Sequence, residues 1–288
     1  MVNIGTTGII PFMYFYGIQR PVGSTYLRVD PIVNGNSGFE NWIHGKKYNN
    51  IIFQQTFWKE MAALFEGPKI IDICDPDWLI LPIDFVETGN LVHAITCSSE
   101  ELTRLVKSYF PDKIVEHVPD RLDFKRFPSP HASHRDKARK AVWFGYIHNA
   151  YEVMEQLLPA LKEYNLELRI IANAPYSKDD GILALNPEFI KYEHHTVNEF
   201  IAEADLLLNP RSEKAYFKYK SNNKSITAWK LGLPVAVTPE DIARLMDPEE
   251  RNREIAVKQP IVEKEYNITQ SVAQYKEIIS TVQNLYFS

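Results

Sequence analysis

A polar segment in the last third of the chain carries the clearest chemical pattern. It reads Lys220-Ser-Asn-Asn-Lys-Ser-Ile-Thr-Ala-Trp-Lys, and a Gly232-Leu-Pro turn and an apolar stretch from Val235 follow it. This pattern predicts a short helix whose first backbone N–H groups lack intrahelical partners and carry a partial positive charge. Together with the ammonium groups of Lys220 and Lys224, the helix start predicts a seat for a phosphate or diphosphate. The alternative interpretation is a solvated basic loop at an ordinary helix–strand joint.

Polar residues near other predicted strand ends extend this candidate phosphate site. Arg211 follows an apolar run and can reach the same phosphates, while Asn222 and Asn223 supply amide groups for hydrogen bonds. Gly145 ends another apolar run and leaves room for a ligand to approach the backbone. His148 can line the ligand or, equally, cap the helix that follows it. The other candidates to line the ligand are Tyr146, Asn149 and Asn173.

Carboxylates gather around a predicted strand end in the N-terminal half. Asp75 and Asp77 flank Pro76 directly after the apolar run that ends at Cys74. A carboxylate that faces a bound hydroxyl can orient it or accept its proton, and Asp75 is the first candidate for this catalytic role. The alternative is turn chemistry alone, because Pro and Asp are common turn residues.

Short apolar runs alternate with helical patterns along the chain, which predicts an α/β fold with parallel, doubly wound sheets. Ser98 or Ser99, followed by two glutamates, predicts a capped helix start. A further helix is expected over 150–164. The strands expected for a first sheet are 50–55, 69–74, 91–97 and 114–118, and those for a second sheet are 141–144, 166–172, 189–192 and 204–208.

A basic stretch with little apolar periodicity separates the two sets of strands. We therefore expect two Rossmann-like domains joined by a linker. The expected boundaries are 1–125 for the N-terminal domain, 126–140 for the linker, 141–262 for the C-terminal domain, 263–282 for a terminal helix and 283–288 for a remnant of a protease-site tag.

The composition excludes several classes of protein. The 288 residues carry a formal net charge of −5, so the chain has no general positive field for nucleic acid. Cys74 and Cys97 lie in apolar surroundings and are expected to be free thiols in a reducing compartment. The sequence contains no apolar run of the roughly 18 residues that a membrane span needs. Its start lacks the basic region of a secretory signal. We therefore expect a cytoplasmic protein.

Three groups of segments follow one another in the chain. Val92–Leu102 and Val118–Phe124 come first, Val142–His148 follows, and Ala204–Pro210 with Asn223–Val235 comes last. In this order and spacing they resemble the glycosyltransferases with two facing Rossmann-like domains, known as the GT-B fold. The first group is similar to the end of that family's N-terminal domain. The second is similar to the first strand and loop of its donor domain, and the third to the run that ends in Gly-x-Pro.

The resemblance implies an enzyme that transfers a sugar from a nucleotide-activated donor, of the UDP- or GDP-sugar class, to an acceptor hydroxyl. It implies that Lys220 and Lys224 stabilise the departing diphosphate and that no metal is obligatory. Arg28 matches an arginine often found after the first loop of such enzymes, so it is a second catalytic candidate. The alternative for Arg28 is a surface pair that anchors its helix. The acceptor is a glycan, a small molecule or a modified base in DNA, and the oligomeric state stays open.

One position departs from the family pattern. Thr227 stands where many retaining members have a glutamate that grips the donor ribose. Its hydroxyl can make one hydrogen bond to a ribose but not the bidentate, charged contact of a carboxylate. The second hypothesis is therefore a non-catalytic nucleotide- or sugar-binding module with a degenerate donor site. A DNA acceptor would be held by the basic stretch 126–140, whose alternative role is a solvated tether.

Overall fold

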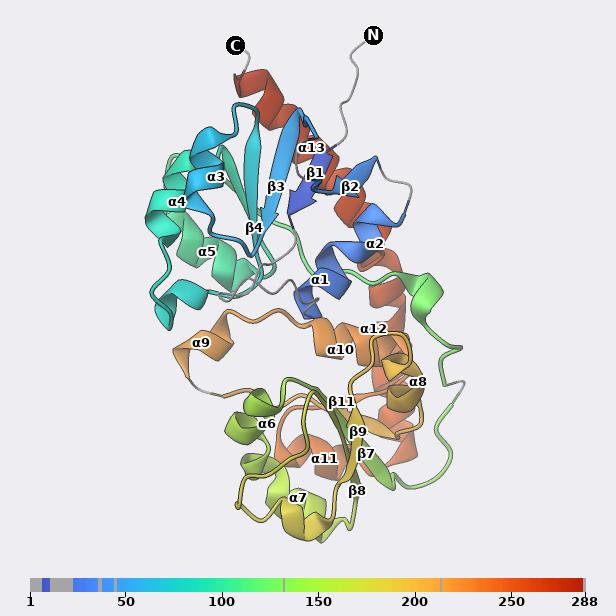
Figure 1. Ribbon diagram of the computed structural model, residues 1–288. Coiled ribbons are helices and arrows are strands. Elements are labelled where there is room, and N and C mark those ends of the chain that lie inside the picture. Colours follow the sequence, from blue (N-terminus) through green and yellow to red (C-terminus); the bar gives the residue numbers. More distant parts are fainter. Residues whose placement is uncertain are drawn as a thin grey trace. The chain divides into compact units, whose positions relative to one another are not determined.

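The computed structural model divides the chain into two compact units (Figure 1). The N-terminal unit comprises Met1–Leu122, Lys218–Ser221 and Asn267–Ser288, and the C-terminal unit comprises Asp123–Phe217 and Asn222–Tyr266. The residues that the structure describes are 7–10, 23–35, 38–43, 46–131, 133–212 and 214–286.

The N-terminal unit is built on a parallel sheet with the strand order β2-β1-β3-β4-β5-β6. Every strand pair in it is parallel. The strands are β1 (Thr7–Ile10), β2 (Phe39–Asn41), β3 (Asn50–Gln54), β4 (Lys69–Ile73), β5 (Ala94–Cys97) and β6 (Ile114–His117). The helices are α1 (Gly23–Arg28), α2 (Asp30–Val33), α3 (Lys59–Leu64), α4 (Phe85–Leu91), α5 (Glu100–Tyr109) and α13 (Ile268–Tyr286), with a short 3₁₀ turn η1 (Asp77–Leu79).

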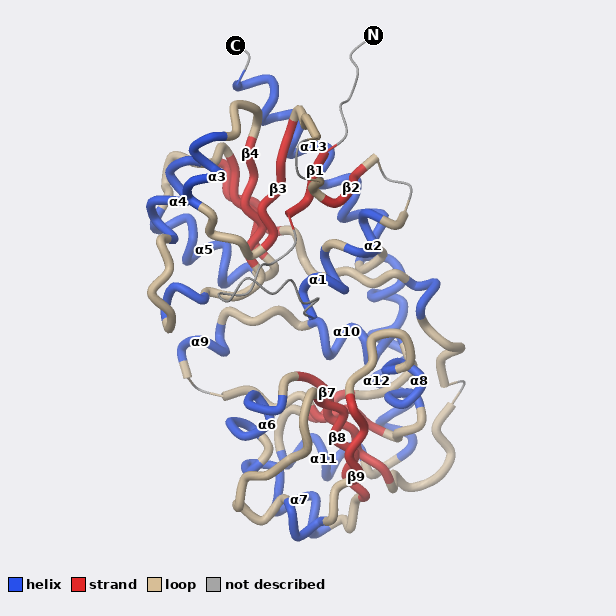
Figure 2. Tube along the Cα trace, viewed as in Figure 1, coloured by secondary structure: helices blue, strands red, loops and turns tan. Residues whose placement is uncertain are grey.

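Helices cover both faces of this sheet, and the alternation of side chains along β3 shows why (Figure 2). Ile51 and Phe53 join the core that α3, α4 and α5 complete, whereas Ile52 joins the core that α2 and α13 complete. A parallel strand with two buried faces reads as one continuous apolar run, which is the pattern that predicted it. The predicted cap of α5 is confirmed, because the Ser99 hydroxyl accepts a hydrogen bond from the backbone N–H of Leu102 at 3.1 Å.

The C-terminal unit is built on a second parallel sheet with the order β11-β10-β7-β8-β9. Its strands are β7 (Lys140–Gly145), β8 (Glu167–Ala172), β9 (Glu188–Lys191), β10 (Leu206–Leu208) and β11 (Val235–Ala236). Its helices are α6 (Ile147–Val153), α7 (Leu158–Glu163), α8 (Val197–Ala202), α9 (Ala215–Lys218), α10 (Asn223–Lys230), α11 (Pro239–Leu245) and α12 (Pro248–Glu265), and its 3₁₀ turns are η2 (Phe124–Arg126), η3 (Glu155–Leu157) and η4 (Leu183–Leu185). One face packs on α6, α7 and α11, and the other packs on α8 and α10. The predicted α/β class with two parallel sheets is confirmed.

Several boundaries differ from those expected. The helix expected over 150–164 is two helices, α6 and α7, separated by the turn η3. The terminal helix begins at Ile268, belongs to the N-terminal unit, and continues through Tyr286 into the residues expected to be a tag remnant. Within it, the Gln283 amide donates to Asn50 Oδ1 at 3.0 Å. Helix α12 was not expected at all.

The basic stretch 126–140 also differs from expectation, because it packs within the C-terminal unit instead of standing apart as a linker. His131 donates its backbone N–H to the Leu231 carbonyl at 3.0 Å, and Asn252 exchanges two hydrogen bonds with the backbone of His134. The Gly232 turn has φ +75°, and a Cβ at this position would lie 2.9 Å from the His131 backbone N. Only glycine therefore fits the turn where this stretch passes over it.

Cys74 and Cys97 are free thiols, as the sequence predicted. In the part of the chain that the structure describes, none of the helices combines the length and apolar character that crossing a membrane requires.

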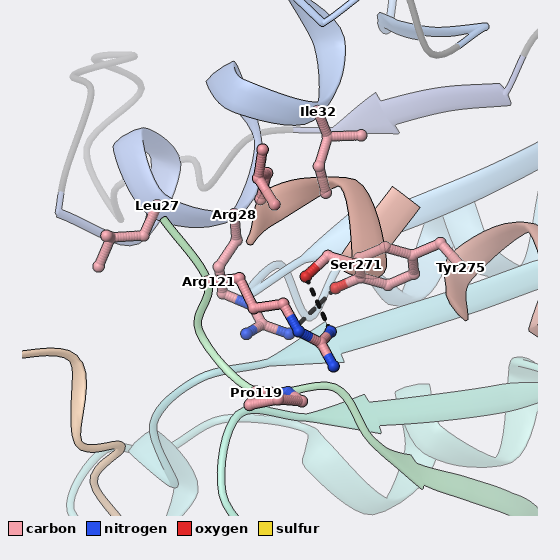
Figure 3. Close-up of a pocket in the computed structure, with 8 residues that line it drawn as sticks. Leu27, Arg28, Ile32, Pro119, Arg121, Ser271 and Tyr275 are labelled. Atoms are coloured by element: carbon pink, nitrogen blue, oxygen red, sulfur yellow. Dashed lines mark hydrogen bonds between the residues drawn. The ribbon is translucent and has the colours of Figure 1, made fainter. Parts of the chain in front are cut away.

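A buried polar cluster centred on Arg28 ties four elements of the N-terminal unit together. The guanidinium donates to both carboxylate oxygens of Asp72 on β4, at 2.7 and 2.6 Å. It also donates to Asp120 Oδ1 at 2.7 Å and to the Val118 carbonyl at 2.9 Å. Its last N–H reaches the Tyr275 hydroxyl on α13 at 3.0 Å (Figure 3). All five donors of this side chain are therefore used inside the unit.

Two further contacts complete the cluster. Tyr275 donates to Asp72 Oδ1 at 2.8 Å, and Thr96 on β5 donates to the same oxygen at 2.6 Å. Beside the cluster, Arg121 donates to Ser271 on α13 at 3.1 Å, which Figure 3 shows together with the small hollow that Arg28 and Tyr275 line. Buried charges persist only when paired and hydrogen-bonded, and this cluster meets that condition.

We expect Arg28→Met to lower the free energy of unfolding of the N-terminal unit by about 3–5 kcal/mol, because Asp72 and Asp120 would stay buried without their cation. Tyr275→Phe removes one hydroxyl from the same cluster and should cost about 1–3 kcal/mol. Urea unfolding followed by circular dichroism measures both changes.

The matched control is Arg104→Met on α5. Arg104 is exposed, and its pairs with Glu100 and Glu101 should contribute less than about 1 kcal/mol. An effect of Arg28→Met as small as that of Arg104→Met would contradict the role assigned to the cluster.

Candidate functional site

The strand order of the C-terminal sheet marks where a ligand should bind. The sheet grows from β7 to β8 and β9 on one side, and the chain then returns to place β10 on the other side of β7. In open parallel sheets, ligands bind outside the carboxyl ends of the strands at the point where the order reverses. Here that point lies between Gly145, which ends β7, and Asn209, which follows β10.

A cation and a helix start meet at this point. Lys224 is the second residue of α10, and its Nζ lies 4.4 Å from the centre of the Trp143 indole ring. Gly145 has φ +144°, and a Cβ there would lie 3.2 Å from Lys224 Nζ and 3.2 Å from the Trp143 ring. Glycine therefore keeps the backbone next to the ammonium open. The sequence predicted Gly145 and Lys224 separately, and the fold brings them together.

The start of α10 is anchored to the end of β10. The Asn209 amide donates to the Ser225 hydroxyl at 2.9 Å, and both residues are buried. Asn222 stands at the N-cap and Asn223 is the first helical residue. The first N–H groups of the helix have no intrahelical acceptor, so the α10 start, the Lys224 ammonium and the open Gly145 backbone make an anion-binding arrangement.

The start of α6 carries three of the predicted ligand-lining residues, namely Tyr146, His148 and Asn149. Tyr146 is its N-cap and is 43% exposed, and the exposed His148 packs edge-on against Tyr151. The Asn173 side chain accepts a hydrogen bond from the backbone N–H of Ile147 at 2.9 Å. Asn173, and not His148, therefore satisfies this helix start. For the predicted contact with a ligand, the Asn173 side chain keeps its amide hydrogens.

The remaining predicted donor-site residues differ in how they present their side chains. Asn149 is half-buried in the first turn of α6. Arg211 follows β10 and is half-buried, and burial lowers the pKa of its guanidinium. Thr227 is only 6% exposed within α10. Thr227 therefore exposes little surface, and its contact with a ribose stays a prediction.

The N-terminal unit holds the candidate carboxylate. Asp75 follows β4, its side chain is 33% exposed, and its Oδ1 lies 3.2 Å from Lys220 Nζ. Burial raises the pKa of Asp75 above its ordinary value, the Lys220 ammonium opposes this, and the nearby Asp77 carboxylate adds to it. A partly exposed carboxyl with a raised pKa is suited to accept a proton from a hydroxyl.

Lys220 and Lys224 belong to different units, and their joint contact with a diphosphate stays a prediction. The segment Lys218–Ser221 is part of the N-terminal unit, whereas Lys224 is part of the C-terminal unit. Besides the Lys220–Asp75 ion pair, Ser221 donates to Asp120 Oδ2 at 2.5 Å. The sequence shows two lysines four residues apart, but the unit boundary falls between them.

Arg28 is corrected from a catalytic candidate to a structural residue. Its five N–H groups are spent on the buried cluster described above, so it has none to offer a substrate.

Three residues at these positions were missed by sequence reasoning. Trp143 is one of them, because its ring lies beneath the Lys224 ammonium. Asp120 accepts hydrogen bonds from both Arg28 and Ser221. Gln55 was expected as the last residue of a strand, and its side chain reaches the turn that carries Asp75. Gln55 directly follows β3 and Asp120 lies three residues after β6, so a polar residue near a strand end is the sequence signal that these two share, whereas Trp143 lies within β7 and carries no such signal.

No protein-family model matches the chain, and no curated protein matches its sequence. Solved structures do match its fold. HepE from Anabaena, in complex with UDP and glucose, has a TM-score of 0.60 and 12% identity, over 91% of this chain and 84% of that chain. AviGT4, a glycosyltransferase involved in avilamycin A biosynthesis, has a TM-score of 0.56 and 11% identity, over 97% and 98% of the two chains.

A chain of the GtfA/B complex has a TM-score of 0.59 and 12% identity, over 82% of this chain. This chain spans only 57% of that one. At identities this low, the structural matches are evidence of a shared architecture alone. That architecture agrees with the two parallel sheets and the terminal helix described above. The chain therefore has the α/β fold of the GT-B-type glycosyltransferases.

Proposed function

We propose that this protein is a glycosyltransferase that moves a sugar from a nucleotide-activated donor to an acceptor hydroxyl. The observation that carries the proposal is the arrangement at the switch point of the C-terminal sheet, where Lys224 and the start of α10 stand beside the open backbone of Gly145. This arrangement suits the diphosphate of a nucleotide sugar, which carries the charge that cations and helix starts stabilise.

The proposed reaction divides its work between named groups. The acceptor oxygen forms a bond to the anomeric carbon of the donor, and the bond from that carbon to the diphosphate oxygen breaks. The electron pair of the broken bond leaves with the nucleoside diphosphate, where Lys224 and the α10 start stabilise it. The proton of the acceptor hydroxyl passes to the Asp75 carboxylate.

We propose UDP as the nucleotide. The support is that HepE, which shares this fold, is in complex with UDP and glucose. Without an exposed side chain at Thr227, the ribose would rely on other groups of the C-terminal unit.

We propose a glycan or a small molecule as the acceptor, in preference to DNA. Cations of the basic stretch 126–140 are engaged within the C-terminal unit: Arg126 Nε lies 3.4 Å from Asp123, and Lys140 Nζ lies 3.8 Å from Glu188. Such pairs compete with phosphate for these cations. The two free thiols, Cys74 and Cys97, support a reducing compartment such as the cytoplasm.

The second candidate function is a nucleotide- or sugar-binding module without catalysis. The burial of Thr227 favours it, because the position that often grips the ribose offers no exposed polar group here. Incubation with UDP-glucose separates the two functions: release of UDP supports the transferase, and binding without UDP release supports the module.

We expect Lys224→Met to weaken the binding of UDP by roughly ten- to a hundred-fold, which corresponds to the loss of about 1.5–3 kcal/mol for a charged hydrogen bond. Isothermal titration calorimetry measures the affinity. Lys230→Met, at the other end of α10, is the control and should leave UDP affinity within about two-fold, because the Lys230 ammonium pairs with Glu263. Equal affinities of the Lys224 and Lys230 variants would rule out the proposed diphosphate seat.

The rate of UDP release from UDP-glucose should rise with pH as Asp75 loses its proton, because only the carboxylate accepts a proton. The midpoint of this rise should lie above the ordinary carboxyl pKa of about 3.9. Lys220→Met removes a cation that lowers the pKa of Asp75, so the midpoint should move to higher pH.

A pH–rate profile measures this shift, with Lys218→Met as the control. Lys218 lies over the ring of the neighbouring Tyr219, and its loss should leave the midpoint where it is. A profile that is the same for wild type, Lys220→Met and Asp75→Asn would show that Asp75 is not the proton acceptor.

A further inference from the structure

The side-chain amide of Gln55 makes several hydrogen bonds to the turn that carries Asp75. Its Nε2 donates to the backbone carbonyl of Asp75 at 2.8 Å and to Asp77 Oδ2 at 2.8 Å. Its Oε1 accepts from the backbone N–H of Cys74 at 2.8 Å and from that of Asp75 at 3.3 Å. One buried amide thus contacts both ends of the turn and the backbone of Asp75 on each side of its side chain.

The backbone of Gln55 is strained in a way that serves this contact. Among the non-glycine residues that the structure describes, three have positive φ: Asn165, Asn186 and Gln55, the last at φ +46°. Asparagine tolerates the left-handed region, whereas glutamine is uncommon there. Gln55 is only 3% exposed, and its N–H donates to the Asp72 carbonyl at 2.7 Å. Strain that the surrounding structure fixes in place often marks a functional site.

Gln55 also directly continues β3, beside β4. The ladder pairs Gln54 with Asp72, so the left-handed residue begins where the two strands stop pairing. At that position a left-handed backbone departs from the strand path, and the side chain lies against the Cys74–Asp77 turn of the neighbouring strand. The reason for a glutamine, and not a glycine or asparagine, is then the reach of its amide.

We propose that Gln55 is the positioning residue of Asp75: it fixes the turn so that the Asp75 carboxylate is held ready to accept the proton of the attacking hydroxyl. This inference rests on the proposed function of the chain. The groups that face Asp75 are Lys220, Asp77 and Asp120, together with the Cys74 thiol. Of these, Gln55 contacts Asp77 and Cys74 directly.

Gln55→Asn separates this role from simple stability. Asparagine accepts the left-handed backbone, so the variant should keep the backbone path and stay folded, with a lower urea midpoint of unfolding because the shorter amide leaves buried hydrogen bonds unmade. Its amide is one methylene shorter and cannot contact both ends of the turn. Using UDP-glucose hydrolysis, in which water is the attacking hydroxyl and gives its proton to Asp75, we expect kcat to fall at least ten-fold. The KM for UDP-glucose and the affinity for UDP should stay within two-fold.

Gln55→Glu provides a second readout, because a carboxylate can accept the two turn N–H groups but cannot donate to Asp75 and Asp77. Its negative charge beside Asp75 should move the acid limb of the pH–rate profile to higher pH. Gln259→Asn, the same change on α12 of the C-terminal unit, is the matched control and should preserve kcat and the profile, because the Gln259 amide donates only to the Lys230 carbonyl at 3.4 Å among the described contacts.

The outcomes distinguish this inference from the proposed function. If wild-type protein neither binds UDP nor hydrolyses UDP-glucose, the proposed function falls and the role of Gln55 falls with it. If wild type binds and hydrolyses but Gln55→Asn keeps its kcat, only the positioning role is overturned. Loss of kcat in Gln55→Asn with unchanged UDP affinity and a native circular dichroism spectrum under the assay conditions supports it, since a merely structural residue would lower kcat only by unfolding the protein.

Discussion

The N-terminal unit depends on the buried guanidinium of Arg28. Burying a cation is costly unless every donor is paired, and here Asp72 and Asp120 supply the opposing charge. Asp72 lies three residues before Asp75. Asp120 also accepts a hydrogen bond from the Ser221 hydroxyl. The same cluster thus anchors the strand that leads to the candidate carboxylate and the segment that brings Lys220 to it. A fully satisfied network of this kind is rigid, and it restricts the motion of the two segments that carry the candidate site.

The two units carry opposite kinds of chemistry. The candidate site of the C-terminal unit is built from a glycine turn, a helix start and Lys224, which together favour a negatively charged ligand. That of the N-terminal unit is built from Asp75 and Asp77 around a turn, with Lys220 tuning the charge. A reaction that releases an anion and removes a proton needs one environment of each kind. The difference between the two candidate sites follows from which polar residues end the strands of each sheet.

Much of the fold could be predicted from the sequence, because buried parallel strands such as β3 and β4 read as apolar runs and Ser99 shows a capping pattern. Helix α12 could not, since Pro260 lies inside it and its apolar residues follow no helical period. Gly145 and Lys224 could be identified singly. The pairing of Lys220 with Asp75 and the saturation of Arg28 could not, because each joins residues far apart in the chain and no local pattern encodes such a contact.

Helix α13 sets the order in which the two units can complete their folding. The helix contributes Ile268, Tyr275 and Ile279 to one core of the N-terminal unit, although it follows the whole C-terminal unit in the sequence. During translation, the first sheet therefore emerges with one face uncovered and with Arg28 lacking its tyrosine partner. The C-terminal unit, whose segments all precede Asn267, can fold to completion earlier. Of the two units, the one whose synthesis begins first is thus the one completed second, and until α13 is made it exposes apolar surface of the kind that chaperones bind.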